Sequence, residues 1–162
     1  MAKALYILAG YDDNTEKYLS GIQNKLYEAG FTGTQTKNIP MHTTLGSFPC
    51  EKEEELIEFL KKLSSDTKAF EVTFNHIGMF GGGNVLFIAP DANHQLLDLK
   101  EKFGSSYNWA AHTTMLIDDA RVIQQALPVV LEQFKAFSGK VSKLHLYEFF
   151  PTRHIISVDL AE

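Results

Sequence analysis

The 162-residue sequence contains a single cysteine, Cys50, and lacks any apolar run of the length that a membrane-spanning helix needs. One cysteine excludes an internal disulfide and a zinc site built from several cysteines. It also favours a reducing, cytoplasmic location. The six histidines show neither the His-x-His nor the His-Glu-x-x-His spacing of metal sites. We therefore expect no membrane partner, no metal and no other cofactor.

Positive charge is scarce as well. The sequence has 15 lysines and arginines against 20 aspartates and glutamates, which gives a net charge of −5 at pH 7. Because a negative surface repels phosphate backbones, we expect no binding to long DNA or RNA. A small phosphate held by a few local donors is compatible with this charge. Hydrophobic residues make up 44% of the chain and charged residues 22%, which excludes a disordered chain.

Apolar periodicity predicts strands mixed with helices. The expected strands are residues 3–9, 41–48, 69–76, 85–89, 111–117, about 140–149 and 154–160. The expected helices are residues 13–29, 51–63, 91–103 and 118–137, with caps at Asp13 or Asn14, at Asp91 and at Asp118 or Asp119. Pro128 is expected to kink or break the last helix. No linker interrupts this order, so we predict one α+β domain over residues 1–162.

Two matching pentapeptides are the most informative part of the sequence. Both read apolar-His-Thr-Thr-apolar, and each lies on an expected strand: Met41-His42-Thr43-Thr44-Leu45 and Ala111-His112-Thr113-Thr114-Met115. Alternate side chains of a strand share one face. His42 is therefore expected to point the same way as Thr44, and His112 the same way as Thr114. The repetition also indicates a duplicated strand–helix–strand–helix unit.

Two imidazoles and two hydroxyls around one pocket suit the chemistry of a phosphodiester. One neutral histidine can take a proton from a nucleophile, and the other, as imidazolium, can give a proton to the leaving oxygen. Threonine hydroxyls can donate to the non-bridging oxygens as charge develops. We therefore predict a catalytic set that works without a metal: His42, Thr44, His112 and Thr114.

Other roles for these residues are open. A single histidine on a half-buried strand is often a packed, hydrogen-bonded residue, and threonine is a favoured strand former. Two copies in matching contexts favour the functional interpretation. The alternatives are a non-catalytic nucleotide-binding module of the same fold, and a structural or interaction protein in which the motifs belong to the core.

The two His-x-Thr motifs resemble those of the 2H phosphoesterase superfamily, which includes 2′-5′ RNA ligase-like proteins and cyclic phosphodiesterases. The similarity extends to Gly78-Met79-Phe80 before a glycine turn and to the late Leu144-His145-Leu146-Tyr147 strand. The resemblance implies a bilobal fold of two similar α/β halves around a central cleft. It also implies a hydrolase that acts on a cyclic or 2′-linked phosphodiester. We accordingly expect a small nucleotide or a short RNA end as substrate, and a monomer.

Some RNA-acting members of that superfamily carry a basic residue shortly after the second motif, whereas Leu116-Ile117-Asp118-Asp119 follows here. This difference argues against a large RNA substrate and against ligase activity. Three further residues alternate on a late strand and could line the cleft and bind substrate: Lys143, His145 and Tyr147. An exposed polar edge accounts for them equally well. Three aromatic residues could stack on a base, although core positions explain each one singly: Phe48, Phe80 and Trp109.

Overall fold

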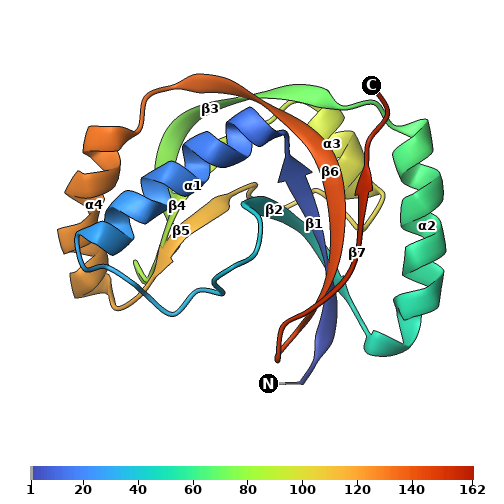
Figure 1. Cartoon of the computed structure of the whole chain (residues 1–162), viewed down its shortest axis with the longest axis horizontal. Coiled ribbons are helices and arrows are strands. Elements are labelled where there is room, and N and C mark those ends of the chain that lie inside the picture. The colour runs from blue at the N-terminus through green and yellow to red at the C-terminus, as the bar shows by residue number, and fades with distance from the viewer. Residues whose placement is uncertain (1) are drawn as a thin grey trace.

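A computed structural model describes residues 2–162 and contains seven strands and four α-helices (Figure 1). The strands are β1 (Ala4–Tyr11), β2 (His42–Phe48), β3 (Phe70–Met79), β4 (Val85–Pro90), β5 (Thr113–Ile117), β6 (Phe137–Phe149) and β7 (Arg153–Asp159). The helices are α1 (Asp13–Glu28), α2 (Glu53–Asp66), α3 (His94–Glu101) and α4 (Ala120–Gln133), with a short 3-10 turn over Cys50–Lys52. The predicted α+β class is confirmed.

One antiparallel sheet runs through the molecule in the order β2-β1-β6-β3-β4-β5, and β7 adds to β6. The long strand β6 belongs to both halves of the sheet. Residues 137–141 pair with β3, residues 141–149 pair with β1, and residues 143–148 also pair with β7. In Figure 1 this strand arches over the top of the molecule. The two halves therefore share one continuous strand.

The two ends of this sheet, β2 and β5, come into contact with each other. In Figure 1 one end of β2 meets one end of β5 near the centre of the molecule. A sheet whose outer strands meet must fold back on itself. Since each of these strands carries or follows one His-Thr-Thr motif, this curvature brings the two motifs together.

The helices bury the faces that their sequences predict. Leu19, Ile22 and Leu26 of α1 are buried, and Leu56 and Leu60 of α2 are buried as well. Helix α1 packs against α4, whereas α2 lies on β7 and β6. The apolar stripes of these helices therefore cover both halves of the sheet.

The expected helix boundaries are partly wrong. Helix α1 is capped by Asp12, whose carboxylate accepts from the Thr15 backbone at 3.0 Å, and α3 is capped by Asn93. Helix α4 continues through Pro128 as one element and ends at Gln133. The expected extension to residue 137 fails because Phe137 opens β6, where its ring stacks on Phe74 with centroids 4.8 Å apart.

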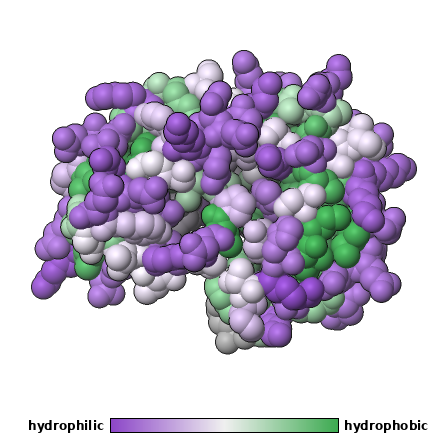
Figure 2. Space-filling view, viewed as in Figure 1, coloured by the Kyte–Doolittle hydropathy of each residue, from purple (hydrophilic) through white to green (hydrophobic). Residues whose placement is uncertain are grey.

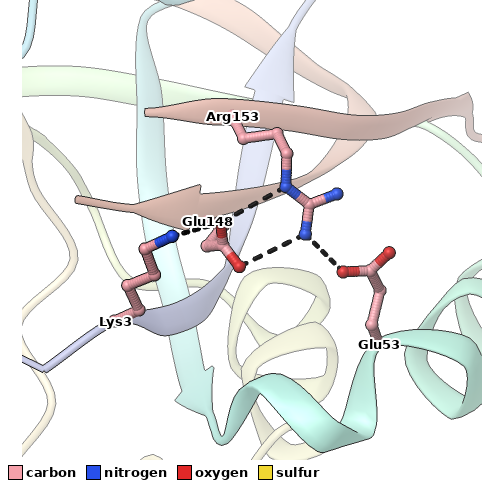
Figure 3. A network of polar contacts seen from close by, with 4 residues as sticks. All are labelled: Lys3, Glu53, Glu148 and Arg153. Carbon is pink, nitrogen blue, oxygen red and sulfur yellow. Dashed lines mark hydrogen bonds and ion pairs between the residues drawn. The ribbon is translucent and has the colours of Figure 1, made fainter. Parts of the chain in front are cut away.

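A polar network joins α2 to the sheet (Figure 3). Arg153 of β7 donates to both carboxylate oxygens of Glu148 on β6, at 3.2 and 3.3 Å, and also to Glu53 at the start of α2. Lys3 lies 3.9 Å from Glu148. These hydrogen bonds from Arg153 lower the pKa of the Glu148 carboxyl. The carboxylate form of Glu148 thus helps to hold three elements together.

Hydrophilic residues cover most of the face seen in Figure 2, and apolar residues gather on its right, over β7 and α2. Within residues 2–162, no helix combines the length and the apolar character required to cross a bilayer.

Candidate active site

The two motifs lie on the edge strands with the same alternation of side chains. Thr43 and Thr113 are each 1% exposed, and the flanking residues of both motifs are half-buried: His42, Thr44, His112 and Thr114. Strand β5 begins at Thr113, so His112 directly precedes the strand that was expected to contain it. The histidine and the outer threonine of each motif therefore face away from the core.

A β-bulge occurs at the same position of both motifs. Along β1, Ile7 pairs with Gly46 and Leu8 with Thr44, so Leu45 is the extra residue on β2. Along β4, Leu86 pairs with Leu116 and Phe87 with Thr114, so Met115 is the extra residue on β5. Bulges bend a strand and redirect its side chains. Each His–Thr pair therefore lies immediately before a local change of strand direction.

The two imidazoles are held in the same way. His42 Nδ1 lies 2.8 Å from the carbonyl oxygen of Pro40, and His112 Nδ1 lies 2.9 Å from that of Ala110. A carbonyl oxygen only accepts hydrogen bonds, so each Nδ1 carries a proton. In the neutral ring Nε2 then has a free lone pair, and in the charged ring Nε2 is a donor. Both rings thus present the same nitrogen for proton transfer.

The surroundings of the two imidazoles differ. Burial lowers the pKa of His42, the bond to the Pro40 carbonyl opposes this shift, and repulsion from His112 adds to it. The ring of His112 packs edge-on against Phe80, with centroids 4.7 Å apart, and against Phe87 at 5.3 Å. The neutral form is therefore favoured at His42.

A cavity of about 290 Å³ adjoins the first motif. It is lined by Tyr6, Gln23, Gln35, Thr36, Ile39, Pro40, Met41, His42, Thr44, Thr114, Ile117, Phe149 and Phe150. His42, Thr44 and Thr114 supply polar groups, whereas Tyr6, Phe149 and Phe150 supply aromatic surface. His112 lies close enough to His42 to repel its charge but is not part of this lining. The cavity can thus accept a phosphate beside an apolar ring system.

The segment before β2 is held against β5 by side-chain amides. Gln35 Nε2 donates to the carbonyl oxygen of Thr32 at 2.9 Å, while its Oε1 accepts from the backbone of Ile117 at 3.0 Å. Gln23 Nε2 donates to the carbonyl oxygen of Met115 at 2.9 Å. These bonds fix one wall of the cavity to the second motif strand.

Tyr11, at the end of β1, is a site residue that the sequence analysis missed. Its hydroxyl lies 2.8 Å from Thr43 Oγ1 and 2.7 Å from Thr113 Oγ1, and its side chain is 3% exposed. Burial raises the pKa of Tyr11 to about 12, although the bonds to Thr113 and Thr43 oppose the shift. The only signal in the sequence is a tyrosine that ends an apolar strand.

None of the other proposed substrate contacts lines the cavity. His145 is 4% exposed; its Nδ1 lies 2.6 Å from Ser157 Oγ, and its Nε2 is buried without a partner among residues 2–162. Tyr147 is buried and stacks on Phe149. Lys143 lies 3.9 Å from Asp159. An exposed polar edge is therefore not observed, and a role of these residues in substrate binding stays a prediction.

The three aromatic candidates are also outside the cavity lining. Trp109 donates from Nε1 to the carbonyl oxygen of Thr44 at 3.2 Å, which links the segment before β5 to β2. Phe80 contacts His112, and Phe48 lies near Phe103 with ring centroids 6.5 Å apart. Two of the three thus contact motif residues.

Gly10 lies beside His42 on β2 and beside Lys143 on β6. A methyl group at Gly10 would collide with the buried ring of His145. We expect Gly10→Ala to destabilise the protein by about 1–3 kcal/mol, the usual cost of overpacking, as measured by urea denaturation.

Gly21→Ala is the matched control, because nothing lies within 4 Å of the added carbon. In the interior of α1 it should stabilise the protein by about 0.5–1 kcal/mol. Equal midpoints for Gly10→Ala and wild type would show that the site tolerates the extra carbon.

The antiparallel sheet, folded back so that its two outer strands are in contact, has the fold of the 2H phosphoesterase class. The family model of the 2′-5′ RNA ligase superfamily matches residues 13–149, and the chain belongs to this superfamily. The resemblance seen in the sequence is therefore confirmed at the level of the family.

Solved structures of the same fold cover nearly the whole chain. E. coli LigT complexed with 3′-AMP has a TM-score of 0.66 and 15% identity, with 100% of both chains covered. E. coli LigT complexed with phosphate has a TM-score of 0.64 and 15% identity, covering 99% of this chain and 98% of LigT. A structure described as a phosphoesterase has a TM-score of 0.61 and 15% identity, covering 99% and 100%. Among curated proteins, no sequence matches this chain.

Proposed function

We propose that this chain hydrolyses the cyclic or 2′-linked phosphodiester of a small nucleotide or of a short RNA end. The observation that carries the proposal is the matched anchoring of His42 and His112. Both rings are fixed through Nδ1 to the carbonyl two residues earlier, which leaves both Nε2 atoms for proton transfer. Thr44 and Thr114 add hydroxyl donors at the adjoining cavity.

In the proposed reaction His42 is the general base. Its lowered pKa keeps the ring neutral at pH values where an ordinary histidine is partly charged. His42 Nε2 takes a proton from water as the water oxygen bonds to phosphorus. The bond from phosphorus to the leaving ribose oxygen breaks, and His112 Nε2–H gives that oxygen its proton. Thr44 and Thr114 donate to the non-bridging oxygens, on which charge develops.

The cavity supports a substrate of nucleotide size. Its volume of about 290 Å³ is at the small end of ligand pockets. Aromatic rings can cover a base, and no lysine or arginine is among the described residues that line it. Such a lining suits the single negative charge of a phosphodiester better than a polyphosphate. E. coli LigT, which has the same fold, was solved with 3′-AMP and with phosphate.

The test is turnover of 2′,3′-cyclic nucleotides with each of the four bases, in the presence of excess EDTA. We expect hydrolysis that EDTA leaves unchanged, because the proposed proton transfers and phosphate contacts use imidazoles and hydroxyls. Within residues 2–162, no group of three or more His, Cys, Asp or Glu residues is arranged to hold a metal ion. Activity that EDTA abolishes and a divalent ion restores would contradict this mechanism.

The alternative is a nucleotide-binding module without turnover. The acidic residues that follow the second motif and the cation-free cavity lining leave few groups for tight binding of a charged ligand. Calorimetric titration with 3′-AMP, run beside the turnover assay, separates the two functions. Binding without hydrolysis of any cyclic nucleotide would favour the module.

A further inference from the structure

We propose that the Tyr11 hydroxyl positions the two His–Thr motifs relative to each other, an inference that rests on the function proposed above. Tyr11 lies on the core side of the motif strands, whereas His42 and Thr44 face the cavity. Its role is therefore indirect. It sets the separation of the groups that act on the substrate.

The geometry centres on the middle residue of each motif. Thr43 lies between His42 and Thr44, and its counterpart Thr113 follows His112 directly. Both Oγ1 atoms bond to the single Tyr11 oxygen, at 2.8 and 2.7 Å. The two threonine oxygens therefore cannot be more than 5.5 Å apart. A change at this oxygen shifts both motifs at once.

Backbone pairing does not provide this connection. The strand pairings of residues 2–162 include none between β2 and β5, although the two strands are in contact. Between the two motifs themselves, the polar links are side-chain bonds, made by Tyr11 on the core side and by Trp109 to the carbonyl oxygen of Thr44. The bonds of Thr34 and Gln35 to the backbone of Ile117 join the segment before β2 to the far end of β5. At the motifs, the alignment of the two edges thus depends on a few side-chain bonds.

The three hydroxyls form one hydrogen-bonded chain, with the Tyr11 oxygen between the two threonine oxygens. A tyrosine hydroxyl has one proton, so Tyr11 donates to at most one of the two threonines and accepts from the other. All three side chains are at most 3% exposed, so water cannot readily replace a missing partner. Burial raises the pKa of Tyr11 to about 12, which keeps the proton in place throughout the pH range of an assay.

The tyrosine ring itself is fixed by the core. It packs edge-on against Phe74 of β3, with centroids 5.5 Å apart, and Phe74 stacks on Phe137 of β6. The hydroxyl is therefore presented from a rigid support. Because the two histidines must act on the attacking and the leaving oxygen of the same phosphate, a misplacement of about 1 Å can lower a rate on the order of 10²-fold.

The experiment compares Tyr11→Phe with wild type in steady-state hydrolysis of a 2′,3′-cyclic nucleotide. We expect kcat to fall by about 10–100-fold with KM within roughly twofold, since the ring stays and the cavity is untouched. Tyr18→Phe is the matched control. Its hydroxyl accepts from the Lys135 backbone at 2.9 Å, away from the motifs, and its loss should leave kcat unchanged.

Two measurements distinguish a positioning role of Tyr11 from an effect of Tyr11 on the stability of the fold. Rates are taken well below the melting temperature of each variant. The titration of His42 is then followed by NMR with and without His112→Ala. In wild type, removal of His112 should raise the pKa of His42, because the repulsion disappears; in Tyr11→Phe this rise should be smaller. If Tyr11→Phe does not fold, the same measurements are made on Thr113→Val, which deletes one of the two hydrogen bonds to the Tyr11 hydroxyl and keeps the shape of the side chain.

The outcomes separate the two proposals. A wild type without turnover of any cyclic nucleotide rejects the proposed function, and the histidine titrations then judge the positioning role alone. The positioning role is overturned by a different result. In that case the wild type turns over the nucleotide, and Tyr11→Phe or Thr113→Val is indistinguishable from Tyr18→Phe in both kcat and the titration of His42.

Discussion

Replacing His42 or His112 by alanine is expected to lower kcat/KM by about 10²–10⁴-fold, because each change removes a proton-transfer group. Both side chains are half-buried at the edge of the core, so the variants should keep the wild-type circular dichroism and melting curve. His94→Ala is the matched control, since His94 is exposed at the start of α3. An unfolded His42→Ala or His112→Ala protein would favour the structural role for these histidines.

The pH dependence of the same variants tests which histidine is the base. The wild-type profile of kcat/KM should be bell-shaped, with two apparent pKa values that belong to the coupled pair. The acid limb should lie below the ordinary histidine value, because burial lowers the pKa of His42. His42→Ala should lose the acid limb and His112→Ala the alkaline limb. The opposite pattern would exchange the two roles.

Acidification is expected to destabilise the fold strongly through His145. Burial, followed by repulsion from His42, lowers the pKa of this imidazole from 6.5 to about 4. Between these values the unfolded chain binds a proton that the folded chain excludes. The stabilising contribution of the neutral His145 side chain to the folded state is therefore intact above pH 6.5. It declines as the pH falls and is fully lost below about pH 4. Linkage gives a loss of roughly 3 kcal/mol in the free energy of unfolding.

The measurement is urea denaturation at pH 7, 5.5 and 4 for wild type and His145→Asn. Asparagine can still bond to Ser157 but does not titrate. The variant should lose less stability on acidification than wild type by about this amount. Other groups, including Glu148, titrate in both proteins and cancel in the difference. If both proteins lose the same stability on acidification, the folded protein takes up a proton at His145 as readily as the unfolded chain does, and this prediction is wrong.

The sequence predicts the parts of this structure that depend on local patterns. The apolar spacing of Leu19, Ile22 and Leu26 places the core face of α1 correctly. The alternation within each His-Thr-Thr motif likewise predicts which threonine is buried. In both cases the period of the element alone decides which side chains face the core.

The sequence does not predict features that arise where distant segments meet. The Tyr11 hydroxyl bonds to threonines on the two opposite edges of the sheet, and no local pattern indicates that these edges touch. His145 alternates like a surface residue, yet the pairing of β6 with β1 and β7 on either side buries it. Packing in the folded sheet, which single-strand patterns do not contain, decides both positions.

The paired bulges at Leu45 and Met115 make the number of residues in each motif strand as critical as the identity of its catalytic side chains. Deletion of either residue would remove the bulge. Either the histidine and outer threonine would then turn toward the core, or the remainder of the edge strand would shift by one residue and expose its buried side. We expect this stretch to accept changes of apolar side chain much more readily than the gain or loss of one residue, and to do so equally in both halves of the molecule.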